Sequence, residues 1–321
     1  MNRILILGLS MVFVVFGTVS FAEEQDSSGI FDLAVGIEGM GGETTYQIGG
    51  NIVYANGASE SIHFPLSELE WPLDIWLGRI DAGLNIGDSW RINGVVKKNI
   101  SDPDSNMKDS DWGVWYLDGD PGTSPSDLDI YSESNISDFD AVIFDIDVEW
   151  AFLQRETWSL FAGIGYQYQN FEYEGQLIEE TGYYLGNPIG TFPGDGSVGI
   201  TYEITYNMPY LLIGTDVNLI DNLTLAGSFT YAPWVEAEDE DHHLMRNKVS
   251  KGDMDGDAFM LDLSAQYNIT PSWFLVAGFH YTKIDVDGDQ NQTINGVPYV
   301  TIEETSESTQ TSGYFKAGFT F

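Results

Sequence analysis

The feature that most restricts the fold is a two-residue alternation of apolar and polar side chains, which returns along the whole chain. Between residues 142 and 152 one face carries Val, Phe, Ile, Val, Trp and Phe in turn, while the other includes Asp145, Asp147 and Glu149. Side chains of a strand point alternately to its two faces, so this pattern indicates strands with one apolar and one polar face. Ten segments alternate in this way, near residues 30–48, 68–86, 88–101, 136–153, 158–175, 200–220, 223–243, 257–269, 273–288 and 311–321.

The connections between these segments differ sharply in length. Many segments are longer than the ~9–11 residues with which a strand crosses a bilayer. Short turns at one rim and long loops at the other are typical of outer-membrane barrels. We therefore predict an all-β fold, a ten-stranded antiparallel transmembrane β-barrel with short periplasmic turns and long extracellular loops. The long connections lie near residues 49–67, 102–135, 176–199, 244–256 and 289–310.

Both ends of the chain indicate export. An apolar run, residues 4–16, is followed by Ser20 and Ala22, which fit the small-x-small rule for signal-peptide cleavage. We therefore expect residues 1–22 to be a signal peptide and residues 23–321 to form the barrel domain. The last segment alternates aromatic residues and stops on a terminal Phe, which resembles the assembly signal of bacterial outer-membrane proteins. The predicted location is therefore the cell outer membrane, with outer-membrane lipid around the barrel.

Composition narrows the chemistry and the partners. The chain has no Cys, which excludes disulfides, thiol catalysis and a lipoprotein anchor. With 50 acidic and only 12 basic residues, the surface repels nucleic acid and attracts cationic partners. Segments 253–257 and 285–289 look like calcium loops but lack the Gly at position 6 and the Glu at position 12. His63 and His280 are too scattered for a zinc site, so we expect no metal.

Two short stretches carry the candidate chemistry. Asp109 and Asp111 are two residues apart, and so are Asp241 and His243. In an extended chain, residues two apart point the same way, so the members of each pair share a face. If the fold brings both pairs to one rim, a carboxylate couple faces an Asp–His couple. Such an arrangement can hold and deprotonate a water molecule.

The stretch Asn106–Trp112 resembles the omptin family of outer-membrane proteases, which carries an Asn-Met-x-Asp-x-Asp-Trp sequence in its second outer loop. Asp120–Thr123, Asn207–Tyr210 and Trp234–His243 resemble further omptin stretches in the same order. Each stretch alone is a weak signal, but together they extend the resemblance over essentially the whole mature chain.

The resemblance implies an aspartic-type endopeptidase acting on peptide or protein substrates at the extracellular side. It assigns Asp109 and Asp111 to the catalytic Asp pair, Asp241 and His243 to the catalytic dyad, and Asp239 to the substrate subsites. Asp241 would fix the tautomer of His243, which acts as general base on a water that attacks the peptide carbonyl. Two close carboxylates do not both ionise easily, so one of the Asp pair would keep a proton for the oxyanion or the leaving amine.

The chain departs from the omptin pattern at two positions. Omptins cleave beside basic residues, but their primary-pocket acid on the first strand aligns with Thr45; we therefore assign substrate binding to the nearby Glu43, together with Asp239, and expect cationic substrates. Omptins also need lipopolysaccharide, held partly by basic residues. The resemblance implies no cofactor other than lipopolysaccharide as an activator. Because Thr205 stands where the sixth strand of the family has Arg, we expect the requirement for lipopolysaccharide to be weakened or lost.

The seventh segment poses a geometric difficulty. Phe229 and Tyr231 face lipid by parity, and strict alternation would turn Asp241 and His243 to the same outer side. We therefore predict a bulge or similar irregularity between Tyr231 and Asp239, which turns the upper strand inward.

Two other functions fit the same barrel. The first is a non-catalytic outer-membrane protein, such as an adhesin or a structural protein, that retains the omptin fold. The second is a small-solute channel, which is disfavoured because side chains largely fill the lumen of a ten-stranded barrel.

Overall fold

The structure is a computed structural model that describes residues 30–321. The predicted signal peptide, residues 1–22, lies outside the described residues and stays a prediction. Among the residues described, no helix is long and apolar enough to cross a membrane.

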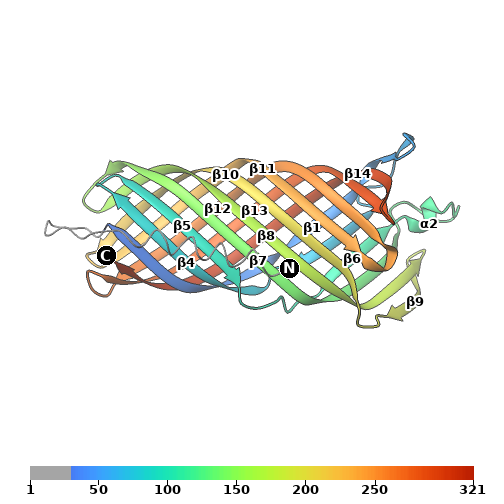
Figure 1. The fold of residues 1–321 in the computed structure, drawn as a ribbon, viewed down its shortest axis with the longest axis horizontal. Coiled ribbons are helices and arrows are strands. Elements are labelled where there is room, and N and C mark those ends of the chain that lie inside the picture. Colours follow the sequence, from blue (N-terminus) through green and yellow to red (C-terminus); the bar gives the residue numbers. More distant parts are fainter. Residues whose placement is uncertain (1–29) are drawn as a thin grey trace.

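Ten long strands of the described chain form a closed antiparallel wall (Figure 1). They pair in the order β5-β4-β1-β14-β13-β12-β11-β10-β8-β7, and β7 pairs again with β5. Closure leaves no unpaired edge, as a membrane barrel requires. This confirms the predicted ten-stranded barrel, whose strands are β1 (Phe31–Tyr54), β4 (Ile75–Ile86), β5 (Trp90–Asn99), β7 (Leu128–Gln154), β8 (Trp158–Tyr184), β10 (Val198–Ile220), β11 (Leu223–His243), β12 (Lys248–Asn268), β13 (Trp273–Ile294) and β14 (Val297–Thr320).

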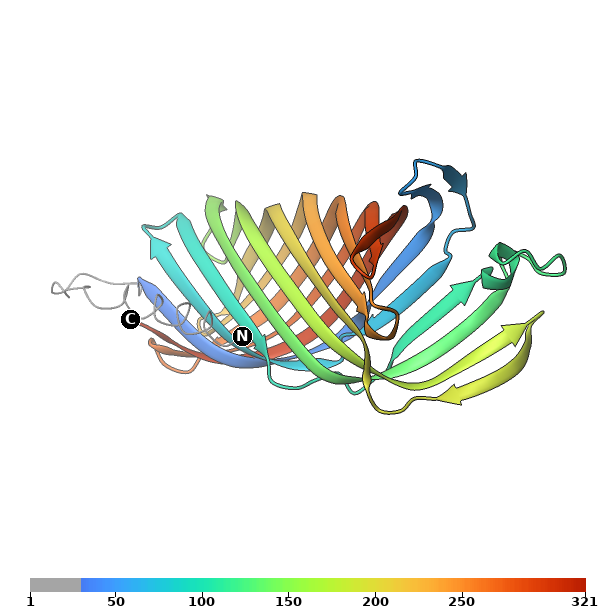
Figure 2. The ribbon, with the colours of Figure 1, turned by 45° about the vertical axis from the view of Figure 1, so that its right-hand side comes forward.

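Four short strands extend the wall at the extracellular end. β3 (Ser67–Pro72) pairs with β1 and with β6 (Met107–Trp112), and β6 pairs in turn with β7, so the two continue the wall beyond β4 and β5. β2 (Ser59–Ser61) pairs with β1, and β9 (Asn187–Pro193) pairs with β8. Figure 2 shows these additions, with the short helix α2 (Val114–Leu117), around the mouth of the barrel.

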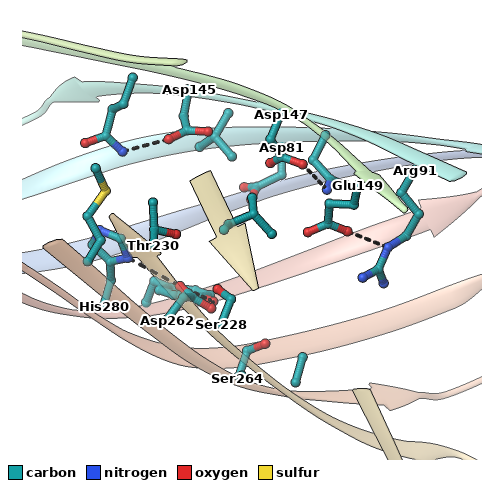
Figure 3. A pocket seen from close by; sticks show the side chains of 18 of the residues that line it. Asp81, Arg91, Asp145, Asp147, Glu149, Ser228, Thr230, Asp262, Ser264 and His280 are labelled. Atoms are coloured by element: carbon teal, nitrogen blue, oxygen red, sulfur yellow. Dashed lines mark hydrogen bonds and ion pairs between the residues drawn. The ribbon is translucent and has the colours of Figure 1, made fainter. Parts of the chain in front are cut away.

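The two faces of the wall have opposite chemistry at mid-height. Outward side chains such as Ile80, Leu211 and Phe315 are large, apolar and exposed, as a lipid-facing belt requires. The lumen is charged here, and Arg79 Nη1 pairs with Glu38 Oε2 at 2.8 Å, because a buried ion must be paired to be tolerated. Figure 3 shows the cavity at this level, about 330 Å³ in volume, with acids of β7 facing side chains of β12 and β13.

Aromatic side chains fill the lumen between this cavity and the extracellular mouth. Trp71 of β3 stacks on Tyr202 of β10, with ring centroids 5.0 Å apart, and contacts Tyr173 of β8 at 4.9 Å. All three are fully buried, and we call them the aromatic layer. The layer explains how so narrow a barrel is packed, and it disfavours the channel hypothesis.

The strands at the extracellular end are longer than predicted. Segments 244–256 and 289–310, predicted as loops, are strand except for short turns. Within the first segment, exposed Asp253 and Asp255 flank the buried Met254. The outer face of the wall meets water at this height, so its side chains are as polar as those of a loop and mask the strand period. The segments that look like calcium loops are therefore paired strands with outward acids.

Candidate active site

An irregularity in β11 places the candidate catalytic residues inside the mouth. Tyr231 is exposed on the lipid-facing side, whereas Asp239 and Asp241 higher on the strand are buried inside. The register with β12 shifts between Ala232 and Val235, where β11 has one residue more than its partner. An extra residue inverts the alternation of every side chain beyond it. The predicted irregularity between Tyr231 and Asp239 is confirmed.

Asp241 and His243 form a close pair at the upper end of β11. His243 Nε2 lies 3.0 Å from Asp241 Oδ2; the Asp241 side chain is fully buried, whereas His243 is partly exposed. Neither Asp241 oxygen accepts an aligned hydrogen bond in this geometry, so the pair is a close contact of a carboxylate with a ring nitrogen.

The tautomer of His243 follows from its second contact. Arg246, in the 3-10 turn η2 (Leu244–Arg246), donates a hydrogen bond of 2.7 Å to His243 Nδ1. Arginine can only donate, so Nδ1 is unprotonated and the ring proton of the neutral imidazole lies on Nε2, toward Asp241. This tautomer turns the Nε2 proton toward Asp241 and leaves Nδ1 as the basic nitrogen.

Asp109 and Asp111 reach the same mouth from β6. Three long strands, β7, β8 and β10, lie between β6 and β11 in the wall. Both are half-buried, and Asp109 Oδ1 has no hydrogen-bond donor. Burial raises the pKa of Asp109 well above its ordinary value, and the negative charges of Asp111 and Asp241 raise it further. The fold therefore brings the two predicted pairs together, and Asp109 holds its proton to a higher pH than a free Asp.

Two buried carboxyl groups lie below the dyad. Asp239 Oδ1 accepts a hydrogen bond of 2.9 Å from the backbone N–H of Gly252. Glu304 of β14, also buried, accepts a bond of 2.7 Å from Gln290 Nε2. A Cβ on Gly252 would lie 1.9 Å from Glu304 Oε2 and 2.6 Å from Asp239 Oδ1, so the lack of a side chain at Gly252 makes room for both acids.

The remaining oxygens of this acid pair are buried. Asp239 Oδ2 and Glu304 Oε2 make no aligned hydrogen bond within the described residues, although the Tyr202 hydroxyl lies near enough to Asp239 to lower its pKa. Burial raises the pKa of Asp239 to about 7 and that of Glu304 well above its ordinary value, to which the Asp239 charge adds. Two facing carboxyls are satisfied when they share one proton, or when a cation sits between them.

The structure corrects one substrate-binding assignment. Glu43 lies on the exposed outer face of β1, where its charge acts on Lys108 of β6. The inward positions of β1 at this height are Thr44 and Tyr46, both buried, so parity turns Glu43 away from the lumen. The prediction that Glu43 joins the substrate site beside Asp239 was therefore wrong.

Sequence reasoning missed Glu304, which occupies the place beside Asp239. A signal for it exists, because the inward face of β14 carries Ser306, Ser308, Gln310 and Ser312 further down, and Glu304 is the acid among these neutral polar residues. That signal is readable only once the direction of β14 and its parity are known. Sequence reasoning also passed over Arg246, which contacts the dyad.

The sequence is similar to those of known proteins. A family model described as the Omptin family matches residues 43–319. The chain is 25% identical over 235 residues to the plasminogen activator of Yersinia pestis, across 72% of this chain and 71% of that protein. It is 26% identical over 223 residues to protease 7 of Escherichia coli O157:H7, across 66% of this chain and 63% of that protein, which is less than two thirds of the latter.

The fold agrees with a solved structure. The crystal structure of outer membrane protease OmpT from Escherichia coli superposes with a TM-score of 0.70 at 18% identity, covering 95% of this chain and 99% of that chain. The family match, which spans most of the sequence, and the shared barrel lead to one conclusion: the chain belongs to the omptin family of outer-membrane β-barrel proteases.

Proposed function

We propose that the protein is an endopeptidase whose catalytic residues are Asp109, Asp111, Asp241 and His243. The observation that carries this proposal is the 3.0 Å contact between His243 Nε2 and Asp241 Oδ2, in the same mouth as the Asp pair. A neutral imidazole beside a buried carboxylate supplies a base, and a carboxyl of raised pKa supplies an acid. The site lies at the extracellular end, so substrates come from outside the cell.

The reaction follows from these roles. His243 Nδ1 takes a proton from a water, and the water oxygen attacks the peptide carbonyl. Asp241 stabilises the imidazolium through the Nε2 proton. A protonated carboxyl of Asp109 or Asp111 donates to the oxyanion of the tetrahedral intermediate. When the C–N bond breaks, the imidazolium returns its proton to the leaving amine, and no covalent acyl-enzyme forms.

For specificity, we propose that Asp239 and Glu304 bind a basic side chain next to the cleaved bond. Lys or Arg would replace the shared proton and donate charge-assisted hydrogen bonds to Asp239 Oδ2 and Glu304 Oε2, which make no aligned hydrogen bond within the described residues. The net charge of −38 favours the approach of cationic peptides.

We further propose that lipopolysaccharide is not a strong activator. Thr205 of β10 accepts a hydrogen bond of 3.0 Å from Asn170 Nδ2 and offers no cation to a lipid phosphate. A groove of about 300 Å³ in the wall nearby would oppose phosphates by charge repulsion. Its acidic lining residues are Asp138, Asp140, Glu172, Glu174, Glu203 and Glu240.

Cleavage of a fluorogenic peptide with an Arg-Arg core tests the function. Refolded wild type is compared with Asp109→Ala and His243→Ala, with and without lipopolysaccharide. The matched control is His242→Ala, because His242 contacts Glu240 and no catalytic acid. We expect turnover to fall about 10²–10⁴-fold in the first two variants and to persist in the control, with little dependence on lipid.

The opposite result favours a different protein. Wild type that is inert on this peptide and on a broad peptide library would identify a non-catalytic barrel, an adhesin or a structural protein. Strong activation by lipopolysaccharide would contradict the proposal about the acidic groove alone.

A further inference from the structure

Lys248 is a cation without a partner at the edge of the site. It is the first residue of β12 and lies directly across from His243. Among the lysines of residues 30–321, Lys248 alone has no carboxylate oxygen within 4.0 Å of its Nζ. It is half-buried, and burial lowers its pKa against the attraction of Asp241, Asp111 and Asp109. An unpaired, half-buried ammonium costs free energy, so an anionic partner that binds here gains affinity.

Arg246 is the second cation at this edge. It is exposed, and it contacts the neutral His243 imidazole instead of a carboxylate, in a chain that has 50 acidic residues. Its guanidinium covers Nδ1, the basic nitrogen of the proposed reaction. A water cannot pass its proton to Nδ1 while this hydrogen bond is made, so Arg246 must move before the chemistry begins.

We propose that Arg246 and Lys248 form a cationic subsite for a carboxylate of the substrate, an acidic side chain near the cleaved bond, and that this carboxylate draws Arg246 off His243 Nδ1. The inference rests on the proposed peptidase function and adds a second specificity element to it. A guanidinium binds a carboxylate bidentately and far more strongly than it binds an imidazole, so exchange of partners is favourable.

The order of residues along β11 gives this subsite its place. Asp239 lies deep in the mouth, Asp241 and His243 lie above it, and Arg246 follows in the turn beyond the strand. A basic side chain that points down to Asp239 therefore leaves the other side of the cleaved bond near the rim cations. The preferred substrate carries opposite charges on the two sides of the cut. Repulsion by the catalytic acids is reduced because Asp109 holds a proton to a raised pH.

Paired peptides test the subsite. Each has Arg before the scissile bond and either Glu or the isosteric Gln at the first or second position after it. One set has a normal bond, and a second set has an N-methylated scissile amide that is not cleaved and reports binding by fluorescence anisotropy. We expect wild type to bind the better Glu peptide about tenfold more tightly than its Gln partner, the size of one charge-assisted contact.

Variants separate the subsite from general charge effects. The double variant Arg246→Ala with Lys248→Met should bind Glu and Gln peptides equally. Lys251→Met should keep the preference, because Lys251 is exposed on the same strand and pairs with Glu240 at 2.6 Å. With a Gln peptide, Arg246→Ala should have a higher kcat than wild type, because Nδ1 is no longer covered.

Each outcome bears on one proposal. Equal binding of Glu and Gln peptides by wild type overturns the subsite, and this result depends neither on a variant nor on catalysis. A preference that survives in the double variant, which must be folded to bind, also overturns it. A kcat of Arg246→Ala that is equal to or below that of wild type overturns the displacement of Arg246. Failure of wild type to cleave any normal peptide overturns the peptidase function, and the binding comparison still decides the subsite.

Discussion

Replacing Asp239 by Asn isolates the charge of the proposed basic-residue pocket. An Asn Oδ1 can still accept the 2.9 Å hydrogen bond from Gly252, and the amide nitrogen takes the place of Oδ2, which makes no aligned hydrogen bond, beside Glu304. The shape of the pocket is therefore kept while one carboxylate is lost. A hydrogen bond between charged groups contributes about 1.5–3 kcal/mol. Its loss should lower kcat/KM for an Arg peptide about 10- to 100-fold.

The assay compares two peptides that differ only in charge, one with Arg and one with citrulline before the cut. Asp239→Asn should leave kcat/KM of the citrulline peptide within about twofold of wild type, since that peptide never made the charged contact. Burial raises the pKa of Asp239 to about 7, so the carboxylate is charged above that pH and neutral below it. The Arg/citrulline ratio of wild type should therefore rise between pH 6 and pH 8, and that of the variant should stay flat.

Two results would refute this reasoning. A loss that is equal for Arg and citrulline peptides would mean that Asp239 supports the dyad and does not select substrate. A wild-type Arg/citrulline ratio that is constant across neutral pH would mean that the acid pair does not titrate there. Both peptides use the same catalytic residues, so an effect of pH on the chemical step cancels in the ratio.

Three predictions on stability follow from the same region, each read as an unfolding midpoint in detergent. Asp239→Asn should be more stable than wild type at pH 8.5 and lose that advantage at pH 4. The folded-state pKa of Asp239 is raised from 3.8 to about 7, so wild type loses stability as the pH rises through this range; an advantage at acid pH would contradict this sign. Gly252→Ala should cost about 1–3 kcal/mol by overpacking, whereas Gly199→Ala, with open space around its added Cβ, should be near neutral; equal effects would argue against the fit. Trp71→Ala should cost about 3–5 kcal/mol, and the control Trp234→Ala, at an exposed position, much less.

The sequence predicts the barrel well because the alternation of apolar and polar side chains shows which residues of a membrane strand face the lipid. Lipid-facing side chains must be apolar at every second position, so the alternation is strong where the wall crosses the bilayer. The same parity, applied to Tyr231 and Asp241, exposed a contradiction that only an extra residue resolves, and β11 contains it. The conflict between the lipid-facing parity of Tyr231 and the inward position expected of Asp241 therefore predicts the bulge, which neither observation predicts alone.

The sequence does not predict the strands correctly where neither face of the wall is apolar, because the alternation is then lost. At the extracellular end both faces carry polar side chains, so the sequence pattern predicts loops where the structure has strands 248–256 and 289–294. A one-residue uncertainty in register there moves a side chain from one face of the wall to the other, so the pattern does not distinguish the outward Glu43 from an inward acid such as Glu304. Contacts such as Arg246 with His243 depend on the conformation of a short turn, which spacing alone does not specify.

The aromatic layer has a consequence for how the protein can work in its membrane. Trp71, Tyr202 and Tyr173 close the barrel between the candidate site and the cavity below it. Substrate and products therefore enter and leave only through the extracellular mouth, and products do not pass through the barrel toward the periplasm. Such a hydrolase can stand in the outer membrane without forming a pore. The permeability of the membrane is therefore independent of the rate of proteolysis.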